Sequence, residues 1–141
     1  MNLAHIHPMI VHFPIALILF GFLAEVLSHI LKKENWLIKA AFWLMMAGTL
    51  AAIMGYLTGE YFTQELTGEA GELKEKHELF AKITMYVMIA ASAFRLWLLY
   101  SHKSETNLKW IVFTLFLVAA TTIGIVGFLG GSLVYNYMIG I

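Results

Sequence analysis

The chain has no cysteine and few charged residues, and each shortage excludes a class of protein. Without cysteine there is no disulfide, zinc–thiolate site, iron–sulfur cluster or covalently attached c-type haem. Charged residues make up 13% of the 141 positions and hydrophobic residues 60%, against about 25% and roughly 45–50% in soluble domains. The charges of nine basic and nine acidic residues cancel, so the chain has no positive excess that would favour binding to nucleic acid. With a mean hydropathy of +0.77, the composition indicates a small integral membrane protein.

Four apolar runs are long enough to cross a bilayer as helices, which takes about 20 residues. They cover residues 13–31, 36–57, 79–99 and 110–134. The connections between the first two and the last two runs are short, and a longer link over 58–78 joins the pairs. We therefore expect one all-α domain over residues 1–141, an integral membrane four-helix bundle of two antiparallel hairpins. The acidic stretch 69–78 predicts a helical lead-in to the third span.

Basic residues near the span ends predict the orientation, because cytoplasmic loops carry an excess of lysine and arginine. Six of the nine lie at the two short connections, namely Lys32, Lys33, Lys39, Arg95, Lys103 and Lys109. The other three, Lys74, Lys76 and Lys82, lie on or beside the link. The short connections are therefore expected in the cytoplasm. Both termini and the link are then expected outside, which in a bacterium is the periplasmic side of the inner membrane.

Four of the six histidines gather at the predicted outer side: His5, His7, His12 and His77. A histidine at a helix start is often only an interfacial residue, whereas ionisable groups within spans usually face a bundle interior. His12 and His77 open two different spans and are predicted to form a metal-ligand pair. Pro14 removes the partner of the Ile10 carbonyl and is expected to bend the first helix. His7 is then an alternative ligand or a hydrogen-bond partner of the pair.

Small residues form a stripe on the second and on the fourth span. The stripes are Gly48, Ala52, Gly55 and Gly59, and Ala120, Gly124, Gly127 and Gly131. Their steps of four, three and four line one face of a helix. Two interpretations are open: close helix packing, the usual role of such faces in lipid, or room for a flat ligand.

Together, the histidines and glycines predict one b-type haem near the outer leaflet. His12 and His77 would ligate the iron, and the macrocycle would lie against Gly48, Gly55, Gly124, Gly127 and Gly131. Lys82 or Tyr135 would meet the haem propionates. The predicted role is electron transfer, with no independent catalysis beyond it.

Two other functions are compatible with the sequence. One is a non-enzymatic accessory subunit of a larger membrane complex such as a respiratory complex. The other is a copper or zinc site at the outer face, built from His5, His7, Met9 and Met138. At the inner side, Glu25 and His29 have i,i+4 spacing near Arg95 and predict a structural ion pair.

Three motifs resemble those of a bacterial four-helix membrane family, domain of unknown function 2231. The opening reads His7-Pro8-Met9-Ile10-Val11-His12-Phe13-Pro14 and is similar to the family's His-Pro-x-x-Val-His-Phe-Pro. The middle reads His77-Glu78-x-x-Ala81, and the end reads Gly130-Gly131-Ser132-Leu133-Val134-Tyr135. Relatives continue into a Tyr-x-His-Gly-like tail. Here Tyr137-Met138 stands in that place. If the tail histidine of the relatives is a ligand, this chain either lacks that ligand or has Met138 or Tyr137 in its place.

The resemblance implies a location in the bacterial cell membrane and a role at its outer face. Some relatives look fused to Rieske-type or cytochrome c-type domains, which implies electron transfer with a membrane or periplasmic redox partner. Quinol is one such partner. A homodimer and a place in a larger complex both stay open.

Overall fold

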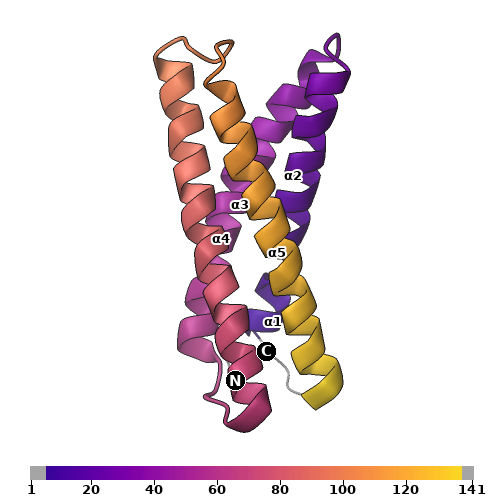
Figure 1. Cartoon of the computed structure of the whole chain (residues 1–141), viewed down its shortest axis with the longest axis vertical. Helices are drawn as coiled ribbons and strands as arrows, with labels where there is room; N and C mark the ends of the chain where they lie inside the picture. The colour runs from indigo at the N-terminus through magenta and orange to yellow at the C-terminus, as the bar shows by residue number, and fades with distance from the viewer. Residues whose placement is uncertain (1–5, 138–141) are drawn as a thin grey trace.

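The computed structural model describes residues 6–137, and every regular element in this range is an α-helix. The helices are α1 (Ile6–Ile10), α2 (His12–Ile30), α3 (Asn35–Phe62), α4 (Gly68–Tyr100) and α5 (Lys109–Tyr137) (Figure 1). α1 and α2 form one span interrupted at Val11, just before Pro14, where the sequence predicts a disturbed helix. The expected all-α four-helix bundle is confirmed. The predictions for His5 and Met138 concern residues outside the described range.

The bundle consists of two antiparallel hairpins, α2–α3 and α4–α5, with more extensive contacts within each hairpin than between them. One end, here called the basic end, carries the connections 31–34 and 101–108 (Figure 1). The opposite link end carries α1, the connection 63–67 and the end of α5. This connection is shorter than predicted because α3 and α4 both continue past the apolar runs. The acidic stretch 69–78 is indeed the first part of α4.

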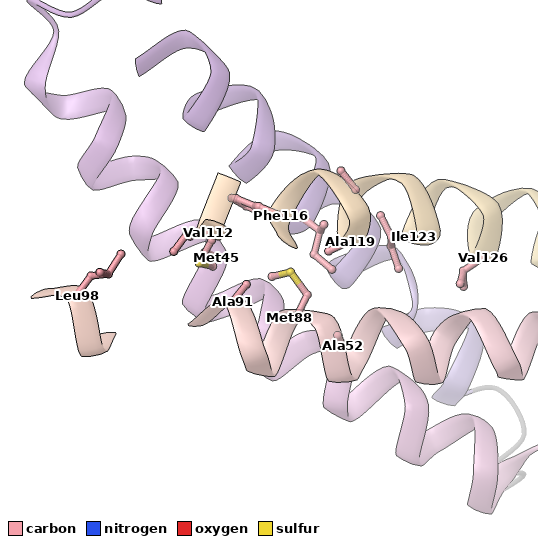
Figure 2. Packing of buried hydrophobic residues seen from close by; sticks show 12 residues of the cluster. Met45, Ala52, Met88, Ala91, Leu98, Val112, Phe116, Ala119, Ile123 and Val126 are labelled. Carbon is pink, nitrogen blue, oxygen red and sulfur yellow. The ribbon is translucent and has the colours of Figure 1, made fainter. Parts of the chain in front are cut away.

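Apolar side chains fill the middle of the bundle and also cover its outside. Ile18, Met45, Met88 and Phe116 are fully buried and bring α2, α3, α4 and α5 together (Figure 2). Large hydrophobic residues elsewhere on all four long helices are exposed. Four helices, counting α1–α2 as one, are long and apolar enough to span a membrane. The exposed apolar surface is therefore the surface that contacts lipid, and the chain is a multi-pass membrane protein.

Buried polar side chains of α4 connect that helix to each of its neighbours. Thr84 donates a hydrogen bond of 2.7 Å to Thr122 on α5, and Ser92 bonds Thr49 on α3 over 2.6 Å. Arg95 forms a salt bridge with Glu25 on α2. His29 lies 3.6 Å from the same carboxylate oxygen, so the predicted ion-pair cluster is present. Because unpaired polar groups are costly in an apolar medium, these contacts fix which helix faces meet.

We expect Arg95→Leu to lower the free energy of unfolding by about 3–5 kcal/mol, because it leaves the buried Glu25 carboxylate without its partner. The double variant Arg95→Leu/Glu25→Leu removes both charges and should recover most of the loss. Equilibrium unfolding in mixed micelles measures both, with Lys33→Leu as an exposed control at the same end. Equal losses in the single and double variants would contradict a role for pairing.

Candidate functional site: two buried histidines at the link end

His7, on the short helix α1, is buried against the end of α3. The Thr58 hydroxyl donates to the Gly55 carbonyl over 3.0 Å, so its oxygen is free to accept. His7 Nδ1 lies 3.0 Å from that oxygen and donates to it when the Thr58 proton is directed to Gly55. In a neutral imidazole the other nitrogen, Nε2, then carries a lone pair.

His77, in the first third of α4, is buried against α5. Its Nδ1 lies 3.1 Å from the Val126 carbonyl oxygen. A carbonyl only accepts hydrogen bonds, so Nδ1 of His77 also carries its proton. A metal-ligating histidine commonly has this second contact, because a carbonyl or similar acceptor on one nitrogen orients the other toward the metal.

The two rings come from different hairpins and lie next to each other. Their centres are 6.3 Å apart, and their planes are nearly perpendicular at 89°. In each ring, Nδ1 is hydrogen-bonded to a group on the other helix of the same hairpin, Thr58 for His7 and Val126 for His77. Nε2 of each ring has no assigned hydrogen bond. The site therefore brings together two imidazole rings from opposite halves of the bundle.

A glycine lies against each of the two histidines. A Cβ built on Gly59 of α3 would be 3.0 Å from Cε1 of His7, and one on Gly130 of α5 would be 3.1 Å from Cε1 of His77. Both distances are closer than side chains normally approach. Gly130 is also four residues after Val126, so its missing side chain opens the carbonyl that His77 uses. Each hairpin thus packs one imidazole ring against one glycine.

His12, predicted as the partner of His77, lies elsewhere. It is exposed, and its Nδ1 is bonded to the Pro8 carbonyl over 2.7 Å on its own span. The structure brings His7, the predicted alternative, to His77 instead. The reason is that His7 and His12 lie on different faces across the interruption at Val11. Lys82 and Tyr135, predicted to meet haem propionates, are both exposed as well.

The predicted glycine stripe on α3 packs against neighbouring residues, whereas the stripe on α5 is mostly open. A Cβ on Gly48 would lie 3.0 Å from Ile18, and one on Gly55 would lie 3.5 Å from Pro14. Gly127 similarly faces Ile15 at 3.5 Å. Only Gly124 and Gly131, of the predicted set, have no such neighbour within 4 Å, and Gly124 is exposed. The stripe on α3 is therefore filled by α2, which favours the packing interpretation there.

Two functional candidates in this region were missed by the sequence analysis. Lys74 is buried one turn before His77 and pairs with Glu78 over 3.1 Å. Thr58 orients His7. The i,i+3 spacing of Lys74 and His77 would have placed both on one face of α4. Thr58 gave no separate signal, because a threonine within an apolar span usually bonds its own helix.

We expect Gly59→Ala and Gly130→Ala each to destabilise the protein by about 1–3 kcal/mol, because the added methyl group overpacks a buried imidazole. Gly124→Ala is the matched control, since its side chain would meet open space. Unfolding of the three variants in detergent provides the comparison. A loss in Gly124→Ala equal to the other two would mean that the histidine contacts are not the cause.

Neither curated proteins nor solved structures gave a significant match to this chain. A family described as predicted membrane protein (DUF2231) matches residues 4–141, nearly the whole sequence and all four spans. The two buried histidines and their glycines lie within the matched range. The chain therefore belongs to the DUF2231 family of predicted membrane proteins, as the three sequence motifs suggested.

Proposed function

We propose that this protein transfers electrons in the membrane and holds one b-type haem whose iron is ligated by His7 and His77. The observation that supports this most directly is the 6.3 Å separation of the two ring centres. Two imidazoles that ligate one metal in line have centres about 6 Å apart, given metal–nitrogen bonds of about 2.0–2.1 Å. Rotation of a ring about such a bond is easy, so perpendicular planes are compatible with shared ligation.

The surroundings of the histidine pair also suit a haem. The two Nδ1–H groups are already bonded, which sets the tautomer that leaves both Nε2 atoms available. Lys74 is a buried cation on the same face of α4 as His77 and is suited to a haem propionate. It takes the role that the sequence assigned to the exposed Lys82 and Tyr135. The macrocycle would enter between the hairpins, where helix contacts are less extensive.

The distribution of lysine and arginine suggests how the protein is oriented in the membrane. Six of the nine lysines and arginines lie at the basic end, which is therefore proposed to face the cytoplasm. The histidine pair would then lie near the outer leaflet of a bacterial cell membrane. A bound haem supplies one-electron exchange between ferric and ferrous iron. A quinol or membrane redox protein would be the donor, and a periplasmic protein the acceptor.

Purified protein should show a Soret band and, after reduction with dithionite, sharp α and β bands. We expect His7→Ala and His77→Ala each to lose the bis-histidine spectrum, because each removes one iron ligand. His12→Ala is the control, since this exposed histidine is hydrogen-bonded to Pro8 of its own span, and its spectrum should be unchanged. Colourless protein from haem-replete cells would reject the haem and favour the role of an accessory subunit.

A single copper(I) ion between the same two imidazoles is the second candidate. The packing of Pro14 and Ile18 against the α3 glycines favours it, because an ion needs far less space than a macrocycle. Residues 6–137 contain no group of three or more His, Cys, Asp or Glu side chains suited to one metal. Zinc prefers four ligands, so this ligand count suits copper(I) better than zinc.

Elemental analysis separates the two candidates. Colourless protein reconstituted with copper(I) should hold about one copper per chain if the ion is bound between His7 and His77. His7→Ala and His77→Ala should both reduce this to background, while His12→Ala should bind as the unmodified chain does. Copper that follows His12 instead would assign the metal to the exposed face of α2.

A further inference from the structure

A cavity of about 550 Å³ lies at the basic end, and all four long helices contribute to its lining. The ribbons of the two hairpins diverge toward this end (Figure 1). The volume of the cavity is within the range of small-ligand sites, about 300–1,000 Å³. The cavity is separated from the histidine pair by the length of the bundle and has no part in the proposed metal site.

Cationic side chains of the lining are left without partners. Among residues 6–137, Lys32 and Lys39 make no salt bridge, whereas Lys109 is paired with Glu105. Deeper in the cavity, Arg95 uses Nη2 for Glu25, and its buried Nη1 has no hydrogen-bond acceptor within the described chain. Arg95 offsets the charge of Glu25, and Lys109 offsets that of Glu105. Lys32 and Lys39 then outnumber Glu34, the remaining carboxylate of the lining, by one positive charge.

Beyond Lys39, the wall contributed by α3 is apolar and continues onto the lipid-facing surface. Phe42 and Trp43 line the cavity next to Lys39, and Trp43 is 69% exposed on the outside of the bundle. An occupant can therefore place an anionic group against the lysines and an apolar chain along this wall. A soluble anion would contact only the lysines and would leave the apolar wall uncovered.

We propose that this cavity binds the phosphate of an anionic phospholipid, with Lys32 and Lys39 as the main contacts and Arg95 behind them. Basic pockets between membrane helices, at the level of the headgroups, are suited to such lipids. The free N–H groups of Arg95 provide charged donors for phosphate oxygens after a small side-chain movement. The acyl chains lie against Phe42 and Trp43. This proposal is independent of whether a metal is bound at the link end.

Native mass spectrometry of the full-length protein in detergent, with phosphatidylglycerol or phosphatidylcholine added, tests the proposal. We expect phosphatidylglycerol to bind about tenfold more tightly than phosphatidylcholine, since only the former carries a net charge. Lys32→Gln/Lys39→Gln should reduce phosphatidylglycerol binding by about tenfold. Lys33→Gln/Lys103→Gln is the matched control, because it removes the same charge from the same end at positions that do not line the cavity.

Each other outcome would overturn the proposal. Equal loss in the two double variants would mean general attraction between lipid and the basic end rather than a site. Equal binding of the two lipids would remove the role of the headgroup charge. Inorganic phosphate is added in a separate competition experiment. Displacement of the lipid by millimolar phosphate would assign the site to a soluble anion. Melting temperatures in phosphatidylcholine nanodiscs verify that both double variants are folded.

Discussion

The arrangement of the bundle depends on the free-energy cost of burying a polar side chain among apolar helices without any partner. α4 carries five buried polar side chains, and Lys74 among them pairs with Glu78 on α4 itself. The other four contact another helix: His77 and Thr84 contact α5, Ser92 contacts α3, and Arg95 contacts α2. Apolar contacts alone tolerate a rotation or a slip of one helix turn, since lipid is as apolar as the core. A slip would break all four polar contacts at once. These contacts therefore set the register that places His77 beside His7.

The span positions, the hairpins and the Glu25–His29 pair follow from the sequence because they depend on local composition and on i,i+4 spacing. The choice between His7 and His12 does not. It depends on the side of the interruption at Val11 on which each residue lies, and on which α3 residues pack against that side. The sequence did contain one unused signal: 52 residues separate His7 from Gly59, and 53 separate His77 from Gly130. The cavity at the basic end was not predictable, because it depends on how far the hairpins diverge.

The two ends of the molecule are separated by a dry middle. Ile18, Met45, Met88 and Phe116 are fully buried there, and the Thr84–Thr122 and Thr49–Ser92 pairs are local bridges between helices rather than a continuous chain. Protons move along hydrogen-bonded groups or water, and thioether and hydrocarbon side chains provide neither. The described structure thus favours two independent sites, one of imidazoles at the link end and one of cations at the basic end.

The division of the histidine pair between two hairpins has an energetic consequence. Each hairpin completes one half of the site by itself, with its own glycine and its own acceptor for Nδ1, but contacts between the hairpins are less extensive than those within them. A metal shared by His7 and His77 would therefore act where the bundle is weakest. Because a ligand that binds only the assembled state stabilises that state in proportion to its affinity, a metal there would hold the two halves together. The proposed metal would then also contribute to the stability of the bundle.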